Sequence, residues 1–217
     1  AGGLEEGEFQ GIFFDDSDVF KIVEGASYSL RVNSNPDLKK HLDEVIHKIA
    51  SAQEDDGYLY TNRTINPQKA ADGAGKVRWT GLEIFHELYN VGHLYEAAVA
   101  HYEATGERKL LDVAIKNANL VESVFGPNKN IGVPGHQEIE IGLVKLYRVT
   151  GEKKYLDLAK FFIDQKGRNK NERIHNDFKK ANPWGEDEFD LDYWQGEYAQ
   201  DHMPLSDQEE AVGHAVR

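Results

Sequence analysis

One sequence pattern occurs twice in the chain with an offset of 45 residues, and this repeat limits the possible folds more than any other feature. The segment YEATGERKLLDVA at 102–114 matches YRVTGEKKYLDLA at 147–159, and a looser copy runs from Tyr28 through Pro36 to Val45. Each copy is typical of two helices joined by a tight turn. In the two close copies, Gly106 and Gly151 stand where a left-handed residue closes the first helix. The chain is therefore expected to be a series of helical hairpins.

Hairpins of this kind bury their apolar faces only by stacking on their neighbours. The stack is either an open superhelix with short, regular loops or a closed ring, the (α/α) barrel. Here the segments 61–78 and 166–206 read as long loops, and the second contains many aromatic residues. Because long loops usually carry function, the sequence favours an all-α barrel whose loops cover a central pocket.

Hydrophobic periodicity and capping residues predict the individual helices. Asp16 or Ser17 can cap the first helix, Pro36 suits the first position of the second, and Gly57 is a plausible C-cap. The last residues read as the start of an amphipathic helix, so we expect that the chain was cut from something longer at both ends. The predicted helices cover about 17–26, 36–52, 80–105, 107–124, 136–149 and 152–165, and a further one begins near 207.

The charge and composition argue against several classes of partner. There are 38 Asp and Glu against 25 Lys and Arg, and the net charge of -13 argues against nucleic acid, because phosphate binding needs a basic face. No apolar run approaches the ~20 residues of a membrane-spanning helix, so no membrane partner is expected. The chain has no cysteine and can hold neither a disulfide nor a cysteine-ligated zinc. A neutral sugar is compatible with this profile.

The most informative segment for function is HELYNVGHL at 86–94. His86, Tyr89, Asn90 and His93 fall at i, i+3, i+4 and i+7, so they share one helix face. The remaining faces carry apolar residues, which indicates that the helix is buried and that the polar stripe faces a cavity or a buried hydrogen-bond network. The plainer interpretation is a set of structural histidines with satisfied hydrogen bonds.

Three Gly-His steps favour the cavity. They place His93, His136 and His214 on the first helices of successive hairpins, and therefore around one axis. Imidazoles hydrogen-bond sugar hydroxyls well. Aromatic residues that could stack on sugar rings are Trp79, Tyr89, Trp184, Trp194 and Tyr198, although most of them are individually more typical of core or loop packing.

Other catalytic patterns are weaker. His86-Glu87 begins like a zinc-protease helix, but Asn90 stands at i+4 where the second histidine ligand must fall, so zinc chemistry of that type is set aside. The acidic clusters 15–18 and 53–56 offer carboxylates, which glycosidases need in pairs. Nothing in the sequence selects a pair, because helix capping explains the first cluster and a solvated turn explains the second.

Taken together, these segments resemble glycoside hydrolase family 127, the β-L-arabinofuranosidase family, formerly a bacterial domain of unknown function. The resemblance spans nearly the whole chain in the family's order, and it is specific as a set although no single piece is. The matching segments lie at 7–9, 16–19, 53–59, 78–80, 86–93, 97–102, 134–140, 143–147, 200–205 and 210–217.

The resemblance implies that residues 1–217 are the N-terminal portion of a single (α/α)6 catalytic barrel domain in a longer bacterial protein. It implies hydrolysis of terminal β-L-arabinofuranosides with retention. In the family a zinc-bound cysteine thiolate is the nucleophile and a glutamate is the general acid/base. The zinc ligands are cysteines and a glutamate, and all of these groups are expected beyond the position that matches Arg217. This chain alone would then bind no metal, contain no catalytic residue and be inactive.

By position, the resemblance matches His86, His136 and His214 to histidines that line the family's sugar pocket. With Tyr89, Trp79 and His93, these are the residues that we expect to bind the carbohydrate substrate. Asn90 stands where many members have cysteine, a departure that bears on substrate choice. Two alternatives remain at this point. One is another (α/α)-barrel sugar enzyme, such as an epimerase or an unsaturated glucuronyl hydrolase, and the other is a non-enzymatic helical-repeat scaffold.

Overall fold

The computed structural model describes the chain except for residues 66, 68–76, 80–81, 83–84, 169–195 and 214–217. The described residues form seven α-helices and one short 3-10 helix and contain no β-strand, so the all-α prediction is confirmed. The 3-10 helix, Leu205–Asp207, follows the last α-helix. The α-helices are α1 (Asp16–Val32), α2 (Pro36–Ala52), α3 (Thr61–Ile65), α4 (Glu87–Thr105), α5 (Lys109–Val124), α6 (Ile139–Thr150) and α7 (Lys153–Gln165).

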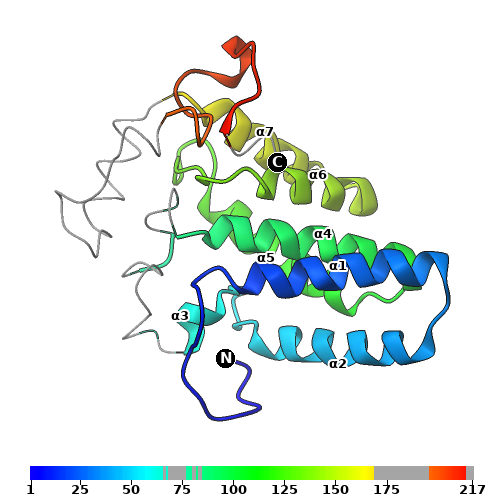
Figure 1. Cartoon of the computed structure of the whole chain (residues 1–217). Coiled ribbons are helices and arrows are strands. Elements are labelled where there is room, and N and C mark those ends of the chain that lie inside the picture. The colour runs from blue at the N-terminus through cyan, green and yellow to red at the C-terminus, as the bar shows by residue number, and fades with distance from the viewer. Residues whose placement is uncertain (66, 68–76, 80–81, 83–84, 169–195, 214–217) are drawn as a thin grey trace.

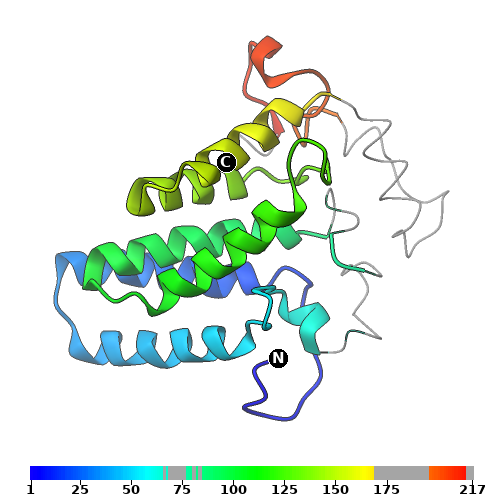
Figure 2. The same ribbon diagram turned by 180° about the vertical axis from the view of Figure 1, so that it is seen from behind.

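Six of the helices form three hairpins that are arranged in two layers. Helices α1, α4 and α6 lie side by side in one layer, with α4 packed against both neighbours (Figure 1). Helices α2, α5 and α7 form the second layer, which is seen more directly from behind (Figure 2). Each hairpin therefore gives its first helix to one layer and its second helix to the other, as in part of an (α/α) barrel.

The sequence repeat corresponds to two turns with the same hydrogen bonds. Gly106 and Gly151 both have φ 76°, and their N–H groups donate to the carbonyls of Tyr102 and Tyr147 at 2.8 Å. The hydroxyl of the threonine before each glycine also donates to a helix carbonyl, at 2.7 Å in both turns. The left-handed turn glycines predicted from the repeat are confirmed.

The two ends of the hairpins differ in the length of their connections. At one end, only residues 33–35, 106–108 and 151–152 join the helices. At the other end lie α3 and the segments that precede α4 and α6, and there α1, α4 and α6 all begin (Figure 1). We call this the loop-rich end. The loops at this end therefore lie next to the N-termini of α1, α4 and α6.

The core lies between the layers and is centred on α4. In α4, Leu88 and Val91 are at most 2% exposed, and Leu94 and Ala98 are fully buried. Two glycines let α4 and α6 approach closely: a Cβ added to Gly142 would lie 2.6 Å from the carbonyl oxygen of Gly92. No described helix is both long enough and apolar enough to cross a membrane.

Several predicted helix boundaries were wrong. Helix α4 begins at Glu87 rather than near residue 80, because Leu82 lies in a turn and His86 adopts a left-handed conformation that a helix cannot contain. Helix α2 ends at Ala52 as predicted, but its C-cap is Gln53, and Gly57 (φ 101°) lies in the turn that follows. Helix α3 falls within the predicted loop at 61–78. Residues 208–212 are not helical, and residues 214–217 of the predicted last helix lie outside the described residues.

Candidate functional site

Two histidines from different hairpins lie ring against ring at the loop-rich end. The ring centroids of His86, just before α4, and His136, just before α6, are 4.6 Å apart. Tyr89 lies 5.5 Å from the first and 5.6 Å from the second, and His93 lies 4.6 Å from Tyr89. These four residues, which we call the histidine cluster, were predicted from the sequence to line one pocket, and the structure brings them together.

Neighbouring segments cover the histidine cluster on two sides. Phe14, just before α1, stacks on His86 with 4.7 Å between the ring centroids. Tyr198, far along the chain, lies with its ring 5.5 Å from that of His136. The Lys21 ammonium of α1 lies 5.2 Å from the centre of the Tyr89 ring. All three hairpins therefore contribute to the surroundings of the cluster.

The structure places the other predicted binding residues differently. The Trp79 ring packs edge-on against Tyr58 and Phe125, at 5.2 and 5.6 Å, within the core rather than among the histidines. Asn90 is fully buried, and its Oδ1 accepts a hydrogen bond from the Ser17 N–H at 3.1 Å, so it faces α1. His214, Trp184 and Trp194 lie outside the described residues.

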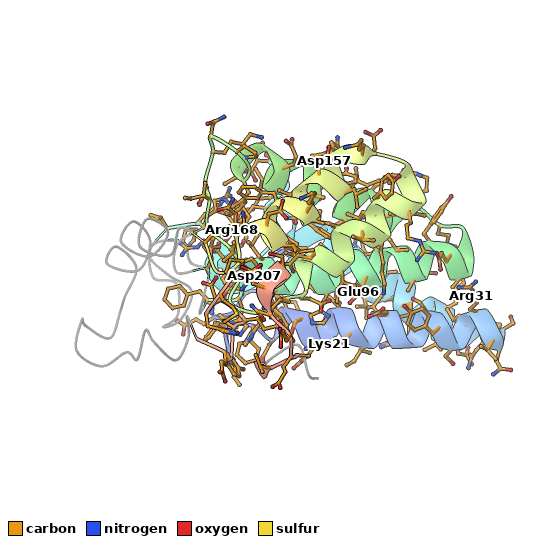
Figure 3. The ribbon with its side chains drawn as sticks, turned by 90° about the horizontal axis from the view of Figure 1, so that it is seen from above. Lys21, Arg31, Glu96, Asp157, Arg168 and Asp207 are labelled. Atoms are coloured by element: carbon orange, nitrogen blue, oxygen red, sulfur yellow. The ribbon has the colours of Figure 1, made fainter. Side chains whose placement is uncertain are left out.

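A chain of buried and partly buried ionisable groups begins at His93 and connects the three first-layer helices. His93 Nδ1 lies 3.1 Å from Oε1 of Glu138, at the start of α6. Glu138 hydrogen-bonds Glu96 of α4, and the Lys145 ammonium of α6 pairs with Glu96 and, at 3.2 Å, with Glu24 of α1. Figure 3 labels Glu96 on α4 and Lys21 on the adjacent α1. This acidic network lies directly behind the histidine cluster.

The two carboxyl groups at the centre of the network have opposite pKa shifts. Burial, the hydrogen bond to Glu96 and the charge of Glu96 raise the pKa of Glu138 to about 10. Burial acts to raise the pKa of Glu96 as well, but the bond from Glu138 and the Lys145 ammonium outweigh it and hold that pKa below its usual value. The raised pKa of Glu138 favours the form in which Glu138 carries a proton and donates it to the Glu96 carboxylate.

A second buried carboxyl group lies next to His86 in the chain. Glu87 is 1% exposed, and it accepts hydrogen bonds from the Tyr58 hydroxyl and, at 2.9 Å, from the Trp79 N–H. Burial raises the pKa of Glu87 to about 7, although the bond from Tyr58 opposes this shift. Glu87, Glu96, Glu138 and Lys145 were not predicted from the sequence as site residues. The available signal was a set of charged residues in helices that otherwise read as buried.

The described residues contain two groups that combine histidine with carboxylates, and neither fits zinc well. In the group of His93, Glu96 and Glu138, the Lys145 ammonium already contacts Glu96. In the group of Asp43, His101 and Glu107, the Lys39 ammonium lies 3.0 Å from Asp43 and 2.6 Å from Glu107. A lysine thus occupies the position where a cation would neutralise these carboxylates. Cysteine, the preferred soft ligand of zinc, is absent from the chain.

The histidine cluster is suited to binding a neutral polyol. Imidazole nitrogens and tyrosine hydroxyls both donate and accept hydrogen bonds, and aromatic faces can pack against the C–H face of a sugar ring. Glu138, which contacts His93, and Glu87, which follows His86 in the chain, are engaged in the buried bonds described above. The geometry therefore offers recognition groups rather than an evident acid and nucleophile pair.

Comparisons with known proteins place this chain in a family. The sequence model of the β-L-arabinofuranosidase GH127 catalytic domain matches residues 1–217. A non-reducing end β-L-arabinofuranosidase of Bifidobacterium longum subsp. longum is 41% identical over 220 residues, covering 100% of this chain and 32% of that protein.

Solved structures agree with the sequence match. The GH127 β-L-arabinofuranosidase of Geobacillus stearothermophilus T6 is 42% identical with a TM-score of 0.83, and the match covers 100% of this chain and 33% of that one. Another GH127 β-arabinofuranosidase is 46% identical with a TM-score of 0.80, covering 97% and 30%. The chain thus spans about a third of the length of these relatives. It belongs to the GH127 β-L-arabinofuranosidase family, and all of its 217 residues fall within the match to that family's catalytic domain.

Proposed function

We propose that this chain is the N-terminal portion of the (α/α)6 catalytic barrel of a glycoside hydrolase that acts with retention on terminal β-L-arabinofuranosides, and that it supplies part of the sugar pocket. The observation that carries the proposal is the His86–His136 pair with Tyr89, at the loop-rich end of three adjacent hairpins. The family match, together with the activity named for the relatives, supports this substrate class.

In this proposal the histidine cluster binds the sugar and does not perform the chemistry. His86 and His136 hydrogen-bond sugar hydroxyls, and Tyr89 closes the wall between them. His214 is proposed to add a third imidazole to the same pocket. Sugar contacts by His93 and Trp79 stay predictions, since the first is engaged with Glu138 and the second packs in the core.

The catalytic groups are proposed to lie in the remaining part of a longer protein. Retaining hydrolysis needs a nucleophile and an acid/base about 5 Å apart, and this chain has no cysteine. A family zinc site built from cysteine and glutamate would likewise come from that remaining part. The proposed partners of this chain are therefore its own C-terminal continuation and a carbohydrate. An epimerase, a glucuronyl hydrolase or a repeat scaffold is favoured by no observation.

The test uses the longer protein with an aryl β-L-arabinofuranoside as substrate. We expect His86→Ala and His136→Ala each to raise KM by about 10-fold or more, because a lost hydrogen bond to a bound hydroxyl is worth roughly 1–3 kcal/mol. The matched control is His41→Ala, since His41 is exposed on α2 in the second layer. Equal KM values for all three variants would contradict the proposal, and so would a wild-type protein without activity on this substrate.

A further inference from the structure

The backbone at His86 adopts a conformation that a residue with a side chain seldom adopts. Its φ of 59° and ψ of 16° lie in the left-handed region, immediately before the first residue of α4. For a non-glycine residue this conformation is strained, because the Cβ crowds the neighbouring carbonyl oxygen. It persists only where the surrounding structure imposes it, and here it sets the direction of the His86 ring.

Two tyrosines hold the residues on either side of His86. The Tyr60 hydroxyl donates to the carbonyl of Phe85 at 2.7 Å, and the Tyr58 hydroxyl donates to the carboxyl group of Glu87. The second carboxyl oxygen of Glu87 accepts the Trp79 N–H. Tyr58 and Tyr60 are at most 1% exposed, so these bonds form away from water. We call Tyr58, Tyr60 and Glu87 the clamp.

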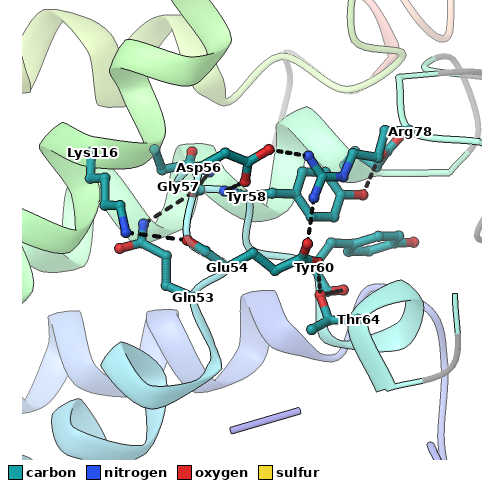
Figure 4. A network of polar contacts seen from close by, with 11 residues as sticks. Gln53, Glu54, Asp56, Gly57, Tyr58, Tyr60, Thr64, Arg78 and Lys116 are labelled. Carbon is teal, nitrogen blue, oxygen red and sulfur yellow. Dashed lines mark hydrogen bonds and ion pairs between the residues drawn. The ribbon is translucent and has the colours of Figure 1, made fainter.

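The segment that carries the tyrosines is itself bonded to the second layer, as Figure 4 shows for its polar contacts. The carbonyl of Gly57 accepts hydrogen bonds from Gln53 Nε2 at 3.1 Å and from Asn117 Nδ2 of α5 at 2.8 Å. The guanidinium of Arg78 lies 4.0 Å from the centre of the Tyr58 ring. Arg78 also pairs with both Glu54 and Asp56, so this turn is bonded within itself and to α5. The two tyrosines of the clamp are therefore held in place by the turn and by α5.

A carboxyl group is energetically unfavourable at the buried position of Glu87. The residue is 1% exposed, and burial raises its pKa to about 7. A well-packed apolar side chain would stabilise the fold at lower cost. Only a side chain with two acceptor oxygens can accept hydrogen bonds from the Tyr58 hydroxyl and from the Trp79 N–H at the same time. The position of the chain before α4 depends on both of these bonds.

We propose that Glu87 is a positioning residue that acts through His86. The clamp holds His86 in its left-handed conformation, so that its imidazole faces His136 and Tyr89. The conformational part of this inference stands on the contacts alone. Its consequence for sugar binding rests on the function proposed above.

The first part of the test is structural and does not depend on activity. Crystal structures of the longer protein with Tyr58→Phe or Glu87→Ala are expected to show residue 86 at negative φ and the His86 ring displaced from His136. The control is Tyr95→Phe, which removes another buried tyrosine hydroxyl, the one that donates to Asn117 at 2.7 Å, without touching the clamp. An unchanged backbone φ and ring position at His86 in both clamp variants would overturn the proposal. If Glu87→Ala does not fold, the structure of Tyr58→Phe alone tests the proposal.

The second part separates positioning from general stability. Glu87→Gln keeps the acceptor for Tyr58 and is expected to raise KM for the arabinofuranoside less than Glu87→Ala, with kcat little changed. In a His86→Ala background, neither substitution at Glu87 should raise KM by more than about 2-fold, because residues that act through one another are not additive. Full additivity would overturn the proposal. A wild-type enzyme without turnover would refute only the proposed function, and the structures would still decide the clamp.

Discussion

At the scale of single residues, Glu87 and Glu138 are both buried carboxyl groups with raised pKa values, but their partners differ. Glu138 shares its proton with Glu96, whereas Glu87 accepts hydrogen bonds from a hydroxyl and a backbone amide. The raised pKa of Glu138 therefore favours its protonated form at neutral pH. Glu87 changes charge near neutral pH.

The free energy of unfolding is expected to depend on pH through Glu87. Its pKa is raised from 4.5 to about 7 on folding, so the folded state binds the extra proton between these values. The stabilising contribution is complete below about pH 4.5 and is lost as the pH rises through 7, on the order of 3 kcal/mol in all. Denaturant unfolding from pH 4.5 to 7.5 should show a shallower decline for Glu87→Gln than for the wild type, and identical slopes would contradict this.

The protonated state of Glu138 leads to a second prediction. Glu138→Gln keeps an uncharged hydrogen-bond donor beside Glu96, so we expect the free energy of unfolding at pH 7 to change by less than about 1 kcal/mol. Lys145→Met removes the cation shared by Glu96 and Glu24 and should destabilise the fold by about 2 kcal/mol.

The control for Lys145 is Lys153→Met, because the pair of Lys153 with Asp157 on α7 is exposed to solvent and is worth little. Thermal unfolding of the three variants at one protein concentration measures the difference. A stability loss for Glu138→Gln as large as that for Lys145→Met would show that Glu138 is ionised.

The sequence was most informative about residue types that are rare in buried helices. His86, Tyr89 and His93 stood out because an apolar helix carried them on one face, and His136 stood out by its Gly-His step. The acids Glu87, Glu96 and Glu138 did not stand out, because charged residues in a helix usually face water. Their burial depends on contacts between residues up to 121 positions apart, such as Lys145 with Glu24, and such contacts have no local signal.

At the scale of elements, the contact between α4 and α6 depends on two glycines. In Gly142→Ala the new Cβ would lie 2.6 Å from the Gly92 carbonyl oxygen and 2.9 Å from Tyr95 Cβ, so the helices must separate. We expect a loss of about 1–3 kcal/mol. Gly25→Ala on α1 is the matched control, because its Cβ meets nothing within 4 Å and alanine favours a helix by up to about 1 kcal/mol. Melting temperatures that shift in the same direction would contradict this prediction.

The helices inside the repeats could be predicted because their signals are local. The Thr-Gly turns and Pro36 fixed the ends of α4 and α6 and the start of α2 to within a residue or two. The start of α4 could not be predicted, because apolar periodicity continues upstream of Glu87 while tertiary bonds from Tyr58 and Tyr60 impose a different backbone. Boundaries set by such bonds are not visible in a window of neighbouring residues.

At the scale of the whole molecule, the chain is expected to be incomplete as an enzyme. Residues 1–217 with added zinc should not hydrolyse an aryl β-L-arabinofuranoside, whereas the longer protein should. Apolar side chains also remain exposed on α1 and α6, with Ile22 at 71% and Ile141 at 50%, so the isolated chain should associate. Activity assays and size-exclusion chromatography test both points. Turnover by residues 1–217 that His86→Ala abolishes would place the chemistry within this chain.

The repeat predicted the hairpins and the two layers, because a hairpin with one apolar side must stack on another. It could not predict how many hairpins complete the ring. A repeat defines the unit and its neighbour, whereas closure depends on the small rotation between successive units, which no single hairpin encodes. The (α/α)6 architecture came from the resemblance to a family and not from periodicity.

The direction of the first-layer helices has an electrostatic consequence. Because α1, α4 and α6 all begin at the loop-rich end, their peptide dipoles are parallel there, and each presents roughly half a positive charge at its N-terminus. The second-layer helices run the opposite way and end there. In an acidic protein of net charge -13, the positive dipole ends of α4 and α6 thus lie beside the residues that carry His86 and His136. Such dipole ends favour the electron-rich oxygens of a ligand.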